Sequence, residues 1–197
     1  SSCRIEIPDV YQFLDCGLDL YAPQTTLDAE GRRILSAWVR MPKVTDEGWI
    51  GMFCTPRVVE VRDGHIFFPM HPNVRAAYSQ EIPAGSQRAK DGYLVSLDLE
   101  DGEELDVGGF VIRREGDRIC TDRSAVFPAF QGAHIHSETP ALKGGCHLDV
   151  VVDKDLVEVF VNEGECVISN AVYGLEDKIG CSGEGKKMRM HIFSAQR

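Results

Sequence analysis

Short runs of β-branched and aromatic residues, each about 5–8 residues long, alternate along the chain with residues typical of turns. Hardly any segment repeats its apolar residues at the helical period, so the pattern predicts an all-β protein. In the first part of the chain the runs predict the strands of one antiparallel meander at residues 18–25, 33–39, 51–62 and 65–71. Asp28-Ala29-Glu30-Gly31 joins the first two, and Asp63-Gly64 is typical of a type I′ hairpin turn between the last two.

The composition changes after residue 74. The segments Arg75-Ala76-Ala77-Tyr78 and Pro83-Ala84-Gly85-Ser86 predict a domain linker with a strand at its edge. Beyond it, strands are expected at residues 93–99, 109–114, 118–121, 147–152, 156–161, 165–169 and 188–193. Many short strands with frequent turns, such as Glu115-Gly116-Asp117 and Asn162-Glu163-Gly164, favour a β-sandwich.

The strand expected at residues 156–161 shows the alternation most clearly. Val157, Val159 and Val161 form a wholly aliphatic face, which we expect to pack inward. Glu158 lies on the opposite, mixed face, where we expect a solvated or hydrogen-bonded sheet carboxylate.

Composition excludes several classes of partner. With 197 residues, of which 43% are hydrophobic, one or two domains with a real core are expected. The formal net charge is 21 − 31 = −10, which would repel a phosphate backbone, so nucleic acid is not expected as a partner. No apolar run approaches the ~20 residues of a membrane span, and residues 1–6 show no signal-peptide pattern, so no membrane partner is expected.

The seven cysteines are odd in number and show no C-x-x-C spacing; they stand at positions 3, 16, 54, 120, 146, 166 and 181. Reduced thiols, and hence a cytoplasmic protein, are favoured over a disulfide framework or a zinc site, while a secreted parent protein stays open. His134 and His136 share one face of an extended segment, but without a third ligand nearby an exposed strand face is expected. No metal or cofactor is expected.

Four segments match the pattern of one known family in the right order. They read DCGLDLYAPQT at residues 15–25, GRRILSAW at 31–38, WIGMFCTPR at 49–57 and VDKDLVEVFVNEGE at 152–165. They resemble glycoside hydrolase family 32, the invertases and β-fructofuranosidases. The first resembles the segment that opens the fifth propeller blade of these enzymes, and the last resembles a hairpin of their carboxy-terminal sandwich.

The resemblance implies an architecture for the whole chain. Residues 1–74 are expected to be the last blade of a five-bladed β-propeller, 75–92 a linker, and 93–197 a carboxy-terminal antiparallel β-sandwich. The chain would then be the carboxy-terminal piece of a longer enzyme. It departs from the family pattern at Leu20, Val39-Arg40, Val58 and Asp155, so the resemblance does not fix the substrate preference.

The resemblance also implies a reaction whose acids are missing here. Retaining glycosidases need two carboxyl groups about 5–5.5 Å apart, one as nucleophile and one as acid and base. By resemblance, the nucleophile comes from a segment like W-M-N-D-P-N-G, a transition-state-stabilising Asp from R-D-P and the acid and base Glu from E-C, all before the last blade. The first two segments occur nowhere in this chain. Glu165-Cys166 is rejected as the acid because it follows a hairpin turn in the expected sandwich. No catalytic residue is therefore expected in this chain, which alone should be inactive.

Substrate-binding residues are still expected in the blade. By resemblance, Asp15 occupies a position that recognises substrate hydroxyls, although it could instead cap the turn before a strand. Asp19 is open between a second pocket carboxylate and an acid at a strand edge.

The aromatic candidates carry similar alternatives. Tyr21 points into the same region by resemblance, or it is an ordinary sheet aromatic. Trp38 could form a flat rim for a sugar face, or it packs in mid-strand. Trp49 and Arg57 are expected to be structural.

Three functions follow from these observations. The first is part of a retaining β-fructofuranosidase acting on sucrose, sucrose 6-phosphate or short fructans, with the fructoside as the partner of the full-length parent. The others are a non-catalytic carbohydrate-binding sandwich and a structural or dimerising module. Residues 15–25 and 49–57 favour the first, because a free-standing lectin has no need of them. We further expect self-association through exposed blade flanks.

Overall fold

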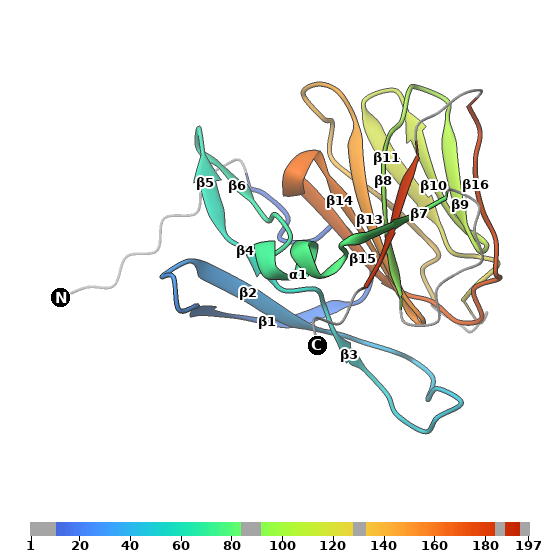
Figure 1. Cartoon of the computed structure of the whole chain (residues 1–197), viewed down its shortest axis with the longest axis horizontal. Coiled ribbons are helices and arrows are strands. Elements are labelled where there is room, and N and C mark those ends of the chain that lie inside the picture. Colours follow the sequence, from blue (N-terminus) through green and yellow to red (C-terminus); the bar gives the residue numbers. More distant parts are fainter. Residues whose placement is uncertain (1–10, 84–91, 128–132, 184–187, 194–197) are drawn as a thin grey trace.

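The computed structural model describes residues 11–83, 92–127, 133–183 and 188–193, which form an all-β chain with one short α-helix (Figure 1). The amino-terminal region (residues 11–71) holds β1 (Leu20–Leu27), β2 (Arg33–Val39), β3 (Met52–Phe53), β4 (Arg57–Val58), β5 (Glu60–Arg62) and β6 (His65–Phe67). Helix α1 (Pro72–Ala77) follows. The sandwich then holds β7 (Gln80–Ile82), β8 (Tyr93–Asp98), β9 (Glu104–Val107), β10 (Phe110–Glu115), β11 (Arg118–Asp122), β12 (His136–Glu138), β13 (His147–Asp153), β14 (Leu156–Val161), the 3₁₀ turn η1 (Asn162–Gly164), β15 (Cys166–Ala171), β16 (Ile179–Cys181) and β17 (Arg189–Ile192).

The amino-terminal region keeps the expected strand order. β1 and β2 form an antiparallel pair, and the turn between them is closed by Asp28, whose carboxylate accepts the N–H groups of Glu30 at 3.0 Å and Arg32 at 2.8 Å. β5 and β6 form the predicted hairpin, with φ of 48° at Asp63 and 76° at Gly64. Positive φ at both positions is what a type I′ turn requires, so this prediction is confirmed.

The third expected strand, residues 51–62, is broken into β3, β4 and β5. β3 and β4 both pair with β2, whereas β5 leaves that sheet to pair with β6. Between β3 and β4, Pro56 has no N–H to donate, and the N–H of Thr55 donates to the Glu158 carboxylate at 2.6 Å instead of to a strand. The prediction of one continuous strand is therefore wrong.

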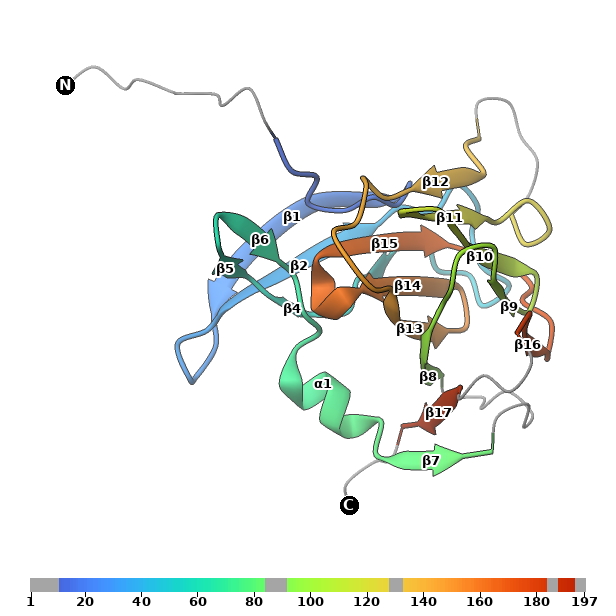
Figure 2. The same ribbon diagram turned by 90° about the horizontal axis from the view of Figure 1, so that it is seen from above.

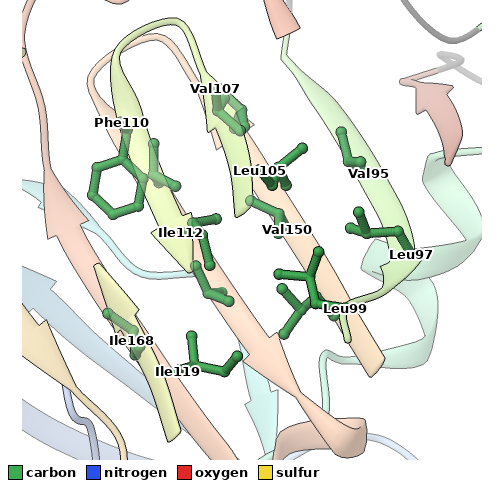
Figure 3. Close-up of a cluster of buried hydrophobic side chains, with 14 of the residues drawn as sticks. Val95, Leu97, Leu99, Leu105, Val107, Phe110, Ile112, Ile119, Val150 and Ile168 are labelled. Atoms are coloured by element: carbon green, nitrogen blue, oxygen red, sulfur yellow. The ribbon is translucent and has the colours of Figure 1, made fainter. Parts of the chain in front are cut away.

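The sandwich consists of two antiparallel sheets. One has the order β15-β14-β13-β8-β17-β7 and the other the order β12-β11-β10-β9-β16. Side chains from both sheets, among them Val150, Phe110 and Ile112, fill the space between them and are fully buried (Figure 3). The predicted sandwich is confirmed, and β9, β12 and β16 are strands that the sequence pattern did not predict.

Strand β14 is buried on both of its faces. The three valines predicted to point inward lie in the core of the sandwich. On the other face, Leu156 and Phe160 pack in a second apolar cluster with Leu35 and Val39 of β2. Glu158, expected on a mixed face, is fully buried there, so this face contacts the amino-terminal region instead of solvent.

The segment predicted as a linker, residues 75–92, contains regular structure. α1 begins after His71, whose Nδ1 accepts the N–H of Asn73 at 3.2 Å, and β7 pairs with β17 at one edge of the six-stranded sheet (Figure 2). Residues 84–91 of this segment lie outside the described residues. The helix has six residues, too few to show a helical period in the sequence. In the described part of the chain, no helix has the length and apolar character needed to cross a membrane.

Residues 15–19 run alongside β15, the edge strand of the six-stranded sheet. The N–H of Cys16 donates to the carbonyl of Val167 at 2.7 Å. Gly17 lies so close to β15 that a Cβ there would sit 2.1 Å from the carbonyl oxygen of Ser169, so only glycine fits. This segment protects the edge strand and ties the amino-terminal region to the sandwich.

Candidate functional site

An exposed row of aromatic side chains crosses the outward face of β1, β2 and β3. Tyr21 pairs with Trp38, and Trp38 pairs with Phe53, so the three rings lie on the same face of the sheet. The ring centroids of Tyr21 and Trp38 are 6.0 Å apart, with an interplanar angle of 70°. The exposed fractions are 52% for Tyr21, 40% for Trp38 and 76% for Phe53. We call this surface the aromatic strip (Tyr21, Trp38 and Phe53).

Two neighbours fix the geometry of the aromatic strip. The guanidinium carbon of Arg40 lies 5.2 Å from the centre of the Tyr21 ring, a cation–π contact. Gly51 has a φ of 82°, and a Cβ at this position would lie 1.9 Å from Nε1 of Trp38. The loop backbone therefore packs directly on the indole, which only glycine allows.

The chemistry of the aromatic strip suits a sugar or another apolar face. An aromatic ring stacks against the C–H face of a sugar, and a neighbouring guanidinium donates hydrogen bonds to its hydroxyl oxygens. Tyr21 and Trp38, both candidates from the sequence, are brought together here. Phe53 and Arg40 were not candidates, and the register of β1, β2 and β3 is what places Phe53 beside them.

Asp19 is buried at the junction between the amino-terminal region and the sandwich. Its Oδ2 lies 2.5 Å from Nη1 of Arg123, and the N–H of Ala171 donates to the same oxygen at 2.8 Å. Arg123 is held in turn over the ring of Phe127, at 3.5 Å from its centre. Asp19 also borders a cavity of about 350 Å³ that Arg40 helps to line. Asp19 has features of both alternatives considered from the sequence. It borders a cavity, as a pocket carboxylate would, and it lies directly before β1, as an acid at a strand edge would.

The side chain of Asp15 is buried at the same junction, against the same strand β15. Its Oδ1 accepts the N–H of Gly17 at 2.7 Å, which is the turn cap considered from the sequence, and the N–H of Ser169 at 3.0 Å. Its Oδ2 lies 2.8 Å from Nη1 of Arg57. Both oxygens therefore contact protein groups, and the side chain is 4% exposed.

Arg57 and Glu158 form a fully buried ion pair at the centre of the junction. Nη2 of Arg57 donates to Oε1 of Glu158 at 2.8 Å, and both side chains are 0% exposed. The Ser169 hydroxyl lies 2.8 Å from Asp15 and 2.9 Å from Glu158, and its single proton can be donated to one of them at a time. The guanidinium of Arg57 thus contacts groups of the protein, as expected of a structural residue.

Two carboxylates and one guanidinium meet in this cluster. Burial disfavours the Arg57 cation, but attraction to Asp15 and Glu158 outweighs burial and raises the pKa of Arg57 above its usual value. Arg57 therefore stays charged at any pH at which the protein is folded. The cluster is suited to holding the two regions together, because a permanently charged guanidinium neither gives nor takes a proton.

The sequence did not identify the partners of this junction. Arg57 and Glu158 are 101 positions apart, and Asp15 and Ser169 are 154 apart. A local pattern carries no signal of such pairs. One position could have indicated a buried ion pair. Glu158 lies in a strand of valines, and a charged side chain there needs a cationic partner if its face of the strand is covered.

The two histidines considered as metal ligands lie at β12. The carbonyl of His134 accepts from Arg123 at 2.9 Å, and the exposed ring of His136 lies 3.8 Å from Asp122. Within residues 11–83, 92–127, 133–183 and 188–193, no three His, Cys, Asp or Glu side chains gather as a metal site.

Comparison with known proteins relates both regions to one family. The model of the "Glycosyl hydrolases family 32 N-terminal domain" matches residues 3–72, and that of the "Glycosyl hydrolases family 32 C terminal" matches residues 94–194. The sucrose-6-phosphate hydrolase of Vibrio alginolyticus is 28% identical over 176 residues, which cover 81% of this chain and 36% of that protein. The raffinose invertase of Escherichia coli is 30% identical over 194 residues, covering 85% of this chain and 40% of that protein.

A solved structure extends the likeness to the fold. The sucrose-6-phosphate hydrolase from Lactobacillus gasseri superposes with a TM-score of 0.77 at 22% identity, covering 92% of this chain and 42% of that chain. At this identity the likeness concerns the fold alone. The chain spans between 36% and 42% of the length of these three relatives.

Proposed function

The chain belongs to family 32 of the glycosyl hydrolases, and from this premise we propose that it supplies the last blade and the sandwich of a β-fructofuranosidase. Its substrates would be terminal β-fructofuranosides such as sucrose, sucrose 6-phosphate or short fructans. The observation that carries this proposal is the match of both regions, in order, to the two domains of one family. The names of the relatives, a sucrose-6-phosphate hydrolase and a raffinose invertase, support the substrate class.

In this proposal the chain binds and positions the sugar while the reactive carboxyl groups come from elsewhere. A retaining glycosidase needs a nucleophile and an acid and base about 5–5.5 Å apart. Tyr21 and Trp38 would present the stacking face for the fructosyl ring, with Arg40 beside them as a donor. The contacts of Asp15 and Asp19 favour a positioning role, in which the two carboxylates hold the start of β1, over direct contact with a sugar.

The activity of the chain tests this proposal. The purified 197-residue chain should release no fructose above background from sucrose, sucrose 6-phosphate or raffinose, because binding contacts without a nucleophile do not open the glycosidic bond. The measurement is an enzymatic assay of free fructose, with an active family 32 enzyme as the positive control. Turnover that survives repurification would contradict the proposal.

The aromatic strip supports a second proposal, that the isolated chain self-associates through this face. Phe53 is 76% exposed beside Trp38, Ile50 in the adjoining loop is 52% exposed, and neighbouring exposed apolar side chains often mark a protein–protein contact. Sedimentation velocity should show a concentration-dependent dimer or larger species. Phe53→Ser should shift the chain toward monomer, whereas Val61→Ser, on the separate β5–β6 hairpin, should not. A monomer that binds no apolar dye would exclude self-association.

A further inference from the structure

A second cavity, of about 610 Å³, lies at the junction and is lined by three cysteines from distant parts of the chain, one of which is Cys146. It lies between the residues that precede β1, the β5–β6 hairpin and the loops of the sandwich next to β13 and β15. Cys16 and Cys166 both line it. Of the seven cysteines, the six in the described residues are free thiols, and Cys3 lies outside those residues.

The backbone holds Cys16 and Cys166 side by side. Cys16 precedes the point where Gly17 packs against β15, and its N–H donates to the carbonyl of Val167, the residue after Cys166. The thiols of Cys16 and Cys166 share a hydrogen bond. Both side chains are half-buried and pack against the edge of the sandwich core. The two thiols therefore lie beside each other at the wall of one cavity, through which small molecules can reach them.

The two thiols differ in acidity. The hydrogen bond with Cys16, opposed by burial and by the charge of Glu165, lowers the pKa of Cys166. The same hydrogen bond, together with burial, raises the pKa of Cys16. By contrast, burial raises the pKa of Cys54 and of Cys146 to about 11, which makes these two thiols poor nucleophiles. The lowered pKa favours Cys166 over Cys16 as the reacting sulfur.

We propose that Cys16 and Cys166 form a reversible disulfide that clamps residues 15–19 onto β15. The oxidant is a peroxide. The Cys166 thiolate attacks one peroxide oxygen, the O–O bond breaks, and protonation gives a sulfenic acid and one molecule of water or alcohol. The Cys16 sulfur then attacks the sulfenic sulfur, the S–S bond forms, the S–O bond breaks, and hydroxide leaves with the Cys16 proton as water. Two thiols are oxidised by two electrons in total, and the peroxide is reduced.

The disulfide would act on the junction that holds the two regions together. Residues 16 and 166 are far apart in sequence, so the crosslink closes a long loop and removes many conformations from the unfolded chain. It would also fix the position of Asp15, which directly precedes Cys16 and contacts Arg57 and Ser169. Oxidation is therefore expected to stabilise the docked amino-terminal region, and a dithiol reductant should reverse the effect.

The test is oxidation of the reduced full chain with hydrogen peroxide, followed by intact mass, peptide mapping and thermal unfolding. We expect a mass loss of about 2 Da, a linked peptide pair containing Cys16 and Cys166, and a rise of the melting temperature by about 5 °C or more. Cys120→Ser, a half-buried thiol on β11, is the matched control and should still give the linked pair. A link between other cysteines, or gain of oxygen atoms without any link, would overturn the proposal.

A second variant tests the order of the two steps independently. In Cys16→Ser the resolving thiol is absent, so a dimedone label is expected at Cys166 after peroxide treatment. Labelling confined to other cysteines would contradict the assignment of Cys166 as the reacting sulfur.

Discussion

The sandwich and the amino-terminal region bury their apolar strand faces in different ways. The sandwich closes a core between its own two sheets, where residues such as Phe110 and Leu148 are fully buried. The inner face of β2 is buried instead against the sandwich, with Leu35 packed in the cluster of Phe160. The outer face of the same sheet is the aromatic strip. The comparison indicates that the sandwich holds itself together, while the amino-terminal region depends on the junction and keeps one face available for a partner.

The largest effect should come from breaking the junction at its charged centre. Arg57→Ala leaves the buried Glu158 carboxylate without its cation, which costs about 3–5 kcal/mol. Urea unfolding followed by circular dichroism measures this loss. Arg62→Ala removes two surface pairs, with Glu60 and Glu163, in which Arg62 is 40% exposed, so it should cost about 1 kcal/mol or less. Equal losses for the two variants would show that the junction is no more important than the surface.

Substitutions that create a cavity in the sandwich core or in the junction cluster should affect the stability of the two regions differently. Leu148→Ala in the sandwich core and Leu35→Ala in the junction cluster each remove a buried side chain, at a cost of about 2–5 kcal/mol. Hydrogen exchange should show that Leu35→Ala exposes β1 and β2 while β13 and β14 stay protected. Leu148→Ala should weaken protection in both regions. Uniform loss of protection in Leu35→Ala would contradict the dependence of one region on the other.

A smaller effect is expected where the loop crosses the aromatic strip. Gly51→Ala forces a Cβ against the Trp38 indole and strains a backbone with positive φ, so it should cost about 1–3 kcal/mol and shift the tryptophan fluorescence. Gly48 has a φ of 87° but no atom within 4 Å of a Cβ. Gly48→Ala should therefore lose stability only through backbone strain and leave the fluorescence of Trp38 unchanged. If the two variants match in stability and fluorescence, the packing of Gly51 on Trp38 has no influence.

The smallest effect is a pH dependence at the β1–β2 turn. Burial opposes ionisation of Asp28, but hydrogen bonds from Arg32 and His71 outweigh it and hold the pKa of Asp28 below its usual value. A lowered folded pKa contributes stability above about pH 4, which is lost as the pH falls through the folded pKa. The stability difference between the natural chain and Asp28→Asn should therefore shrink from pH 6 toward pH 2. A difference that stays constant in urea titrations across this range would contradict it.

Local sequence patterns predicted the parts of this fold that depend on local chemistry. The positive φ of Asp63 and Gly64 and the inward face of β14 follow from turn residues and alternation. The break at Pro56 was missed because the apolar run continues through it. The burial of Glu158 was missed because the cover of its face comes from β2, more than a hundred positions away.

The candidate site shows the same division. Tyr21 and Trp38 meet because β1 and β2 form a hairpin, which the sequence predicts, so their contact follows from local register. The partners of Asp15 and Asp19 are Ser169 and Arg123, which are reached only through the docking of two regions. Ion pairs across such a docking surface have no sequence periodicity, so their positions could not be predicted.

The most direct test of the account is fructose release by a reconstituted pair. The partner would be the part of the Vibrio alginolyticus sucrose-6-phosphate hydrolase that its match to this chain does not cover. We predict no turnover of sucrose 6-phosphate by either part alone, turnover by the mixture, and a strong loss in the mixture when Trp38→Ala opens a gap in the aromatic strip. Turnover by the 197-residue chain alone, or a mixture as active with Trp38→Ala as without it, would contradict the account.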